Sequence, residues 1–244
     1  MPFRPTLWPT VFTIPALIVL LGLGTWQVQR LYEKEAQIAE RTARTTAPPI
    51  GLPAAGAQLS PAALADLDYR HGAATGVFMH EREMYLAART MEGSVGYQIV
   101  TPLQQADGSI VLVNRGWVPE ARKDPAKRPE GQVGGTVTVD GAIRAPGVQH
   151  WLQPDNQPAQ NIWFWSDLPI MAGHAGIALD KLVPVFLEAG PAPNLGGIPI
   201  GGQTKVNLPN DHLQYAITWY ALAAGLAVIY ILYHRQRDKG GRES

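Results

Sequence analysis

Two long uncharged apolar stretches near opposite ends of this chain constrain its fold more than any other feature. They cover Val11–Val28 and Leu213–Tyr233 in a sequence of 244 residues. At 1.5 Å of rise per residue, the two helices would be roughly 27 and 31 Å long, enough to cross a hydrocarbon core about 30 Å thick. The pattern predicts a membrane hairpin that carries one domain. Two buried core helices are the alternative, although neither stretch has the polar face of an amphipathic core helix.

The charges that flank the spans predict their orientation. The short tail after Tyr233 is basic, and short basic flanks stay on the cytoplasmic side. We therefore expect both termini in the cytoplasm and the domain in the periplasm, in a bacterial inner membrane. The first span has no small-x-small cleavage site before Arg30, so we interpret it as an uncleaved anchor. The basic residues on the terminal side are Arg4, Arg235, Arg237, Lys239 and Arg242, and those on the loop side are Arg30, Lys34, Arg41, Arg44 and Lys205.

Changes in composition divide the chain into seven segments. Charged residues spaced by Ala and Gln from Arg30 to Arg44 favour a helix that continues beyond the membrane, and Ser60 with Pro61 is typical of a helix start. The expected segments are a cytoplasmic N-terminus (1–10), a first transmembrane helix (11–29), a stalk and linker with a short helix (30–67), a periplasmic β-rich domain (68–190), a Gly/Pro-rich return segment (191–211), a second transmembrane helix (212–233) and a basic cytoplasmic tail (234–244).

Seven short β-favouring segments fill the loop between the spans, with Gly and Pro in nearly every gap. Their number and spacing predict a mainly β domain, an antiparallel barrel or sandwich with minor α content. Asp107–Gly108 is a good hairpin turn, and Asp167 with Pro169 should start a helix that runs towards Gly176. The expected strands are 69–79, 84–88, 95–103, 110–117, 136–144, 161–165 and 183–188.

Composition and motifs exclude several functions. Lys and Arg balance Asp and Glu at 20 each, and no basic face with interleaved aromatic residues appears, so we expect no nucleic acid partner. The chain has no cysteine, which excludes disulfides, thiolate nucleophiles and cysteine-based metal sites. The usual hydrolase, metalloprotease and nucleotide-binding motifs are missing, and we expect no enzyme. The stretch Glu92–Gly96 only superficially resembles a nucleophile turn.

One histidine is placed where it could ligate a metal. His212 opens the second span, where a neutral ring nitrogen can bind iron without the cost of burying a charge. On a helix, Tyr215 and Trp219 share its face. The antiparallel first span brings Trp26, Gln27 and Arg30 to a similar depth. A flat ring could dock there, with Arg30 pairing an acidic substituent. The alternatives are an interfacial aromatic belt and a histidine that caps its helix.

Three separated motifs stand out in the chain: Leu23–Gln27 with Arg30, Leu112–Pro119, and Gly202–Leu208 together with Asn210 and His212–Tyr220. In this order they resemble the Surfeit locus protein one family, called Shy in yeast. The similarity runs from the first helix to the last and is weaker at Gly96–Pro102 and near Asn161–Ala172.

The resemblance implies an assembly factor for the haem-copper cytochrome c oxidase. In bacteria such a factor binds haem A as a transient cargo and helps to place it in subunit I of the oxidase. The implied partners are therefore subunit I, membrane lipid and haem A synthase. By similarity His212 is the haem-iron ligand. Family members usually have Asn before this histidine, whereas this chain has Asp211, which would favour a protonated ring that cannot coordinate iron.

Two alternatives stay open at this level. The protein could be a scaffold that stabilises oxidase subunits and never binds haem. In the motif Leu112–Pro119, Arg115 and Trp117 could belong to a site or could be structural, with Trp117 in the core and Arg115 paired with a carboxylate at a strand end.

Overall fold

The computed structural model describes residues 5–240, with side chains described for residues 5–236. The chain forms two compact units. A helical unit contains the residues up to Glu40 and from Asn207 onward, and a β unit contains Arg41–Val206. Of the basic residues on the terminal side, Arg4 and Arg242 lie outside the described residues, as do the side chains of Arg237 and Lys239.

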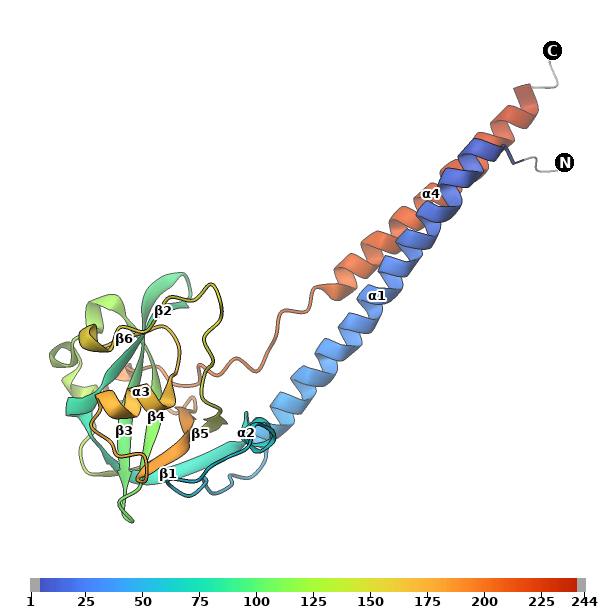
Figure 1. Ribbon diagram of the computed structural model, residues 1–244. Coiled ribbons are helices and arrows are strands. Elements are labelled where there is room, and N and C mark those ends of the chain that lie inside the picture. The colour runs from blue at the N-terminus through green and yellow to red at the C-terminus, as the bar shows by residue number, and fades with distance from the viewer. Residues whose placement is uncertain (1–4, 241–244) are drawn as a thin grey trace. The chain divides into compact units, whose positions relative to one another are not determined.

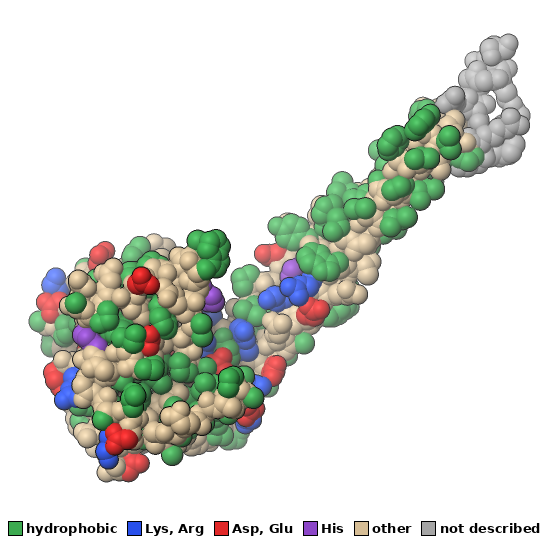
Figure 2. Space-filling model, viewed as in Figure 1, with side chains coloured by type: hydrophobic (Ala, Val, Ile, Leu, Met, Phe, Trp, Pro, Cys, Tyr) green, Lys and Arg blue, Asp and Glu red, His purple; other side chains and the backbone are tan. Residues whose placement is uncertain are grey.

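The helical unit is an antiparallel pair, α1 (Leu7–Thr46) and α4 (His212–Gly240), whose helices lie side by side (Figure 1). Both are long and apolar enough to cross a membrane, and only 6% and 11% of their most apolar windows are buried. Hydrophobic side chains are numerous on the part of the pair toward the chain termini, whereas charged side chains gather toward the C-terminal end of α1 (Figure 2). Core helices of a soluble domain are mostly buried, so this exposure favours the membrane interpretation.

Small and polar residues join the two helices. A Cβ atom on Gly24 would lie 2.8 Å from Cε1 of Tyr220, so only glycine allows this approach. The Tyr220 hydroxyl lies 3.1 Å from Oγ1 of Thr25. At the other end of the pair, the Thr6 amide donates to Nε2 of the buried His234 at 3.0 Å. These contacts set the register of the two helices over most of their length.

The β unit is built around a closed five-stranded barrel, as one of the two sequence-based alternatives predicted. The strands are β1 (His71–Phe78), β2 (Met84–Met91), β3 (Ser94–Gln105), β4 (Ile110–Pro119), β5 (Thr136–Arg144), β6 (Ile162–Trp163) and β7 (Leu182–Ala189). Their order is β1-β5-β7-β4-β3-β2-β6, and a β1–β3 pairing closes the ring of five. Most pairs are antiparallel, but β4–β7 and β2–β6 are parallel.

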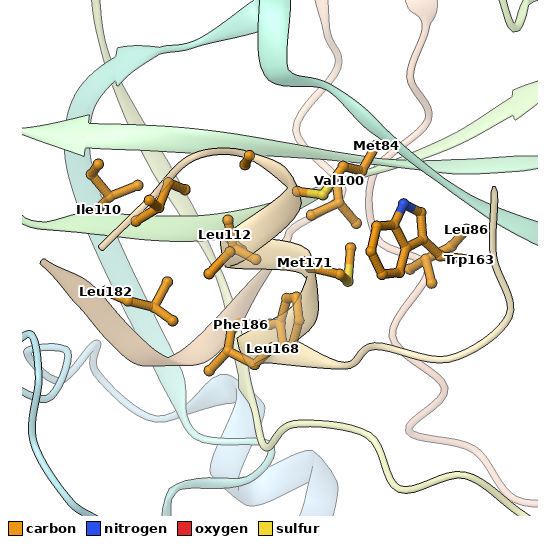
Figure 3. Close-up of a cluster of buried hydrophobic side chains, with 13 residues drawn as sticks. Met84, Leu86, Val100, Ile110, Leu112, Trp163, Leu168, Met171, Leu182 and Phe186 are labelled. Atoms are coloured by element: carbon orange, nitrogen blue, oxygen red, sulfur yellow. The ribbon is translucent and has the colours of Figure 1, made fainter. Parts of the chain in front are cut away.

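Two hydrophobic layers stabilise this unit. The first draws on all five barrel strands, as a barrel interior must, and contains Ala74, Leu103, Val111, Val113, Ile143, Val183, Val185 and Leu187. The second lies where α3 (Leu168–His174) covers the opposite face of β3, β4 and β7, with Leu112, Met171 and Phe186 packed together (Figure 3). Strand β4 therefore has covered side chains on both faces, which explains its nearly continuous apolar sequence.

Local sequence signals correctly located several element boundaries. Ser60 caps α2 (Pro61–Leu67) by accepting from the Ala63 amide, and Asp167 caps α3 by accepting from the Ile170 amide. The Asp107–Gly108 turn joins β3 and β4 as an antiparallel hairpin, with Gly108 at φ 83°. Each signal is a hydrogen bond or a backbone conformation within a few residues, so tertiary packing had little scope to override it.

The motif in β4 is structural in large part. Arg115 is the extra residue of a β-bulge, because Asn114 pairs with Val100 while Gly116 pairs with Ile99. A bulge turns its residue out of the normal alternation, and Arg115 is buried, with one guanidinium nitrogen donating to the Gly131 carbonyl. Among the described residues no carboxylate forms an ion pair with Arg115, so the structural alternative is supported for its burial but not for that partner.

The two residues that follow Arg115 are also structural. Gly116, at φ 115°, has no room for a Cβ, which would lie 2.0 Å from the Ile200 carbonyl oxygen. Trp117 is buried, and its indole donates to the Arg89 carbonyl at 3.0 Å. The structural interpretation of Trp117 is thus supported, because this bond joins β4 to β2.

His71 joins the start of β1 to two acceptors. Its Nε2 lies 2.6 Å from the Asp140 carboxylate, and its Nδ1 lies 2.7 Å from the Ala47 carbonyl. Because both partners are acceptors, both ring nitrogens must carry hydrogen, so this geometry needs the imidazolium form. The hydrogen bonds that His71 donates to Asp140 and Ala47 raise the pKa of His71 above its usual range.

The β unit is therefore expected to lose stability as pH rises. A raised folded-state pKa contributes stability that is complete below the unfolded value of about 6.5 and is lost as pH rises through the folded value. The loss should be modest, since the Asp140 side chain is 61% exposed. Urea unfolding of the whole chain from about pH 6 to 8.5 measures it. His71→Gln should flatten this part of the profile, and an unchanged profile in that variant would contradict the assignment.

Candidate functional site

The candidate site lies at the start of α4, where His212 contacts α1. Nδ1 of His212 lies 2.6 Å from Oε1 of Gln27, and Gln27 is only 9% exposed. This contact joins residues 185 apart in the sequence. A buried amide inside an apolar span needs a partner, and the histidine supplies it.

The hydrogen bond selects one form of the ring. A side-chain carbonyl oxygen can only accept, so Nδ1 of His212 carries the hydrogen and Nε2 keeps its lone pair in the neutral ring. No atom of the described residues forms a hydrogen bond with Nε2 of His212, and the ring is partly buried. Metal-ligating histidines commonly have this arrangement, with one nitrogen bonded to a carbonyl and the other open to the metal. The same bond shows that His212 does not cap its own helix.

The aromatic residues expected beside His212 remain accessible. Tyr215 is 55% exposed and Trp26 is 49% exposed, while Trp219 is partly buried. The small residues on the same face of α4, Ala216 and Ala223, are buried. That part of the face packs inside the helix pair and cannot receive a flat ring. A ligand of His212 must therefore lie on the open side, against exposed aromatic surface.

Arg30 is held by a neighbour on its own helix. Its guanidinium lies 2.7 Å from the Glu33 carboxylate, and both side chains are about half exposed. An exposed pair of this kind contributes only about 0.3–0.5 kcal/mol, so an incoming carboxylate can displace Glu33 at low cost. Arg30 thus keeps the charge needed to pair an acidic group. Asp211, which is exposed, makes no ion pair with His212 among the described side chains.

Sequence reasoning missed the role of Gln27. It placed this residue at the depth of His212 but did not assign it to the site. The available signal was an amide near the end of an uncharged apolar span, because such residues are costly unless they have a partner.

The stretch Glu92–Gly96, which superficially resembles a nucleophile turn, forms a hairpin turn instead. Glu92 and Gly93 have φ of 49° and 80°, and they form the two-residue turn of the β2–β3 hairpin before Ser94. Two positive φ values are typical of a type I′ hairpin turn. A nucleophile turn instead leads from a strand into a helix, and here a strand follows.

Comparisons with known proteins agree with the three motifs. The model of the SURF1 family matches residues 14–224. A SURF1-like protein of Monosiga brevicollis is 40% identical over 238 residues, which cover 93% of this chain and 87% of that protein. Surfeit locus protein 1 of Homo sapiens is 38% identical over 229 residues, covering 87% of this chain and 73% of the human protein. The Rattus norvegicus protein of the same name is 38% identical over 248 residues, covering 96% and 77%.

Proposed function

Because this chain belongs to the SURF1 family, known for cytochrome c oxidase assembly, we propose that it is an oxidase assembly factor that carries haem A to subunit I. The protein would hold haem A briefly as cargo, and no catalytic step is needed. Subunit I would accept the haem, and haem A synthase would supply it.

The open Nε2 of His212 is the observation that supports this proposal most. The Gln27 contact holds the ring in the tautomer that leaves this nitrogen free, which suits an axial haem ligand. Tyr215 and Trp26 offer exposed aromatic surface for the porphyrin, and Arg30 offers a cation for a propionate. A carrier must release its cargo, so one exchangeable protein ligand suits transfer better than two strong ones.

The proposed location is a bacterial inner membrane, with α1 and α4 as the two spans. Both termini would be cytoplasmic, and the β unit would lie in the periplasm. The exposed apolar surface of the two helices supports the spans, and the basic tail in the sequence supports the direction. Reporter fusions at the two termini and within the β unit test this topology.

An absorption spectrum tests the haem proposal directly. The whole chain is produced together with the enzymes that synthesise haem A and is then purified in detergent. A Soret band of haem A, with co-purified subunit I, is the expected result. Co-purification of subunit I without a Soret band would contradict haem carriage and would leave the scaffold function.

Replacing Gln27 tests the orientation of His212. In Gln27→Leu the ring loses the acceptor at Nδ1, so the tautomer and ring direction are no longer held. Loss of such an outer partner typically weakens metal binding by about 10–100-fold. A haem titration of the purified protein measures this loss. Gln29→Leu is the matched control, because Gln29 is exposed on the same helix, and equal affinities in the two variants would argue against the role of Gln27.

A further inference from the structure

A polar cavity of about 220 Å³ lies within the β unit. One side of the cavity is formed by the same face of the sheet that α3 covers further along the strands. Along β4 and β7 the apolar residues Leu112 and Phe186 give way, two residues later, to Asn114 and Glu188, which pair in register. Ser166 and the residues after β5 complete the lining. The same face of the sheet thus lines the hydrophobic core at one end and the polar cavity at the other.

A bulge in β2 places Arg89 in the lining of this cavity. Leu86 pairs with Gln98 and Arg89 pairs with Gly96, so three steps along β2 match two steps along β3. The extra residue reverses the alternation of side chains, and Arg89 therefore shares the inner face with Leu86. Ala88 has φ 54° at this point. A non-glycine residue in this conformation is strained, and strained backbone is concentrated at functional sites.

The guanidinium of Arg89 has no partner in the β unit. Its Nε is buried without an acceptor, and no described residue forms a hydrogen bond or ion pair with this side chain. Burial lowers the pKa of Arg89, and the nearby charge of Glu188 opposes this shift. Arg89 as a whole is partly exposed, but a buried guanidinium nitrogen is normally paired. An unpaired Nε in an arginine that lines a cavity therefore indicates a missing acceptor.

The other charged groups of the cavity are already satisfied. Arg144 donates to Asp68 at 2.9 Å and to Glu188 at 3.2 Å. Asp68 also accepts from the Ala145 amide, and Glu188 also accepts from the Thr204 hydroxyl at 2.6 Å. These groups therefore need no ligand.

One further donor lines the cavity beside Arg89. The amide oxygen of Gln98 accepts from Asn114, and among the described residues its amide nitrogen donates to no protein atom. An occupant that satisfies Arg89 and Gln98 must supply acceptors only.

We propose that this cavity binds the carboxylate of a small organic acid, held by Arg89 and Gln98. A planar carboxylate matches the two-pronged guanidinium. The cavity is smaller than the roughly 300–1,000 Å³ of drug-sized pockets, which limits the ligand to a small acid. Asp68 and Glu188 keep the cavity close to neutral overall, so a singly charged carboxylate is favoured over a doubly charged phosphate. The site is independent of haem binding at His212.

Binding of isotopically labelled acetate to the whole chain in a non-ionic detergent tests this proposal. Line broadening of the labelled carboxyl carbon is expected with the unchanged protein, at matched ionic strength. Arg89→Gln should weaken acetate binding at least tenfold. Arg70→Gln should leave it unchanged, because Arg70 is exposed and pairs with Asp66 elsewhere on the domain. Acetamide, the neutral analogue, should not compete with acetate, and inorganic phosphate should compete only weakly.

The carboxylate site would be overturned if the unchanged protein did not bind acetate, or if Arg89→Gln bound acetate equally well. Competition by acetamide or phosphate as strong as that by unlabelled acetate would also overturn it. If Arg89→Gln does not fold, Gln98→Leu replaces it as the test. That variant keeps the charge, removes the second donor and should weaken acetate binding severalfold, whereas equal binding would contradict the proposal.

Discussion

His212→Ala is expected to remove most of the haem A that the purified protein carries. The variant loses the nitrogen proposed as the axial ligand, whereas the helix pair keeps its contacts at Gly24, Tyr220 and His234. Loss of an outer partner alone costs about 10–100-fold in affinity, so loss of the ligand should exceed a tenfold effect. The ratio of Soret to protein absorbance measures haem occupancy, and circular dichroism confirms the fold.

A second histidine supplies the control for this experiment. His150 is exposed in a loop of the β unit, so His150→Ala should bind haem as the unchanged protein does. Equal occupancy in the two variants would remove His212 from the site. Oxidase assembly that survives in His212→Ala despite haem loss would favour the scaffold function.

Glu83→Ala is expected to destabilise the β unit more than any single change elsewhere in it. Glu83 and Arg128 form a two-pronged ion pair whose side chains are 2% and 0% exposed. Burial lowers the pKa of a second buried arginine, Arg115, to about 10. The charges of Glu83 and Arg128 also act on Arg115, in opposite directions. Removing Glu83 would leave two buried cations without a nearby carboxylate.

The expected cost is about 3–5 kcal/mol, the usual effect of removing one partner of a buried ion pair. Whole domains are stable by only about 5–15 kcal/mol, so the unfolding temperature should fall by about 10 °C. Thermal unfolding followed by near-ultraviolet circular dichroism measures it. Glu81→Ala is the matched control, because Glu81 lies two residues away and its side chain is 69% exposed; it should change stability by less than about 0.5 kcal/mol.

A double variant separates loss of the pair from loss of packing. Glu83→Leu with Arg128→Met replaces both charges of the pair by apolar groups, so Arg128 no longer leaves an uncompensated charge. Only Arg115 then lacks a nearby carboxylate, and part of the stability should return. A double variant as unstable as Glu83→Ala would show that the carboxylate acts in another way than by compensating Arg128.

Only some residues of the candidate site could be predicted from the sequence. His212, Trp26 and Tyr215 could be singled out because residue type, helical spacing and position near a membrane surface are local properties. The role of Gln27 depends on the register between two helices. That register is set by contacts such as Tyr220 against Gly24, and no periodicity in either helix specifies it.

Arg89 shows the same limit within the β unit. Regular alternation from Leu86 would place this side chain on the outer face, and only the bulge opposite Tyr97 brings it inside. The partners of Arg115 were misjudged for the same reason, because it too is a bulge residue.

The sequence by itself determined the two apolar helices, the succession of seven strands and the caps at Ser60 and Asp167. These depend on hydrophobicity, β propensity and hydrogen bonds between residues a few positions apart. Only the tertiary structure decided the closure of the barrel through β1 and β3, the parallel pairing of β4 with β7, and the partners of His212 and Arg89. These contacts join residues far apart in the chain, and the packing of the whole fold selects them.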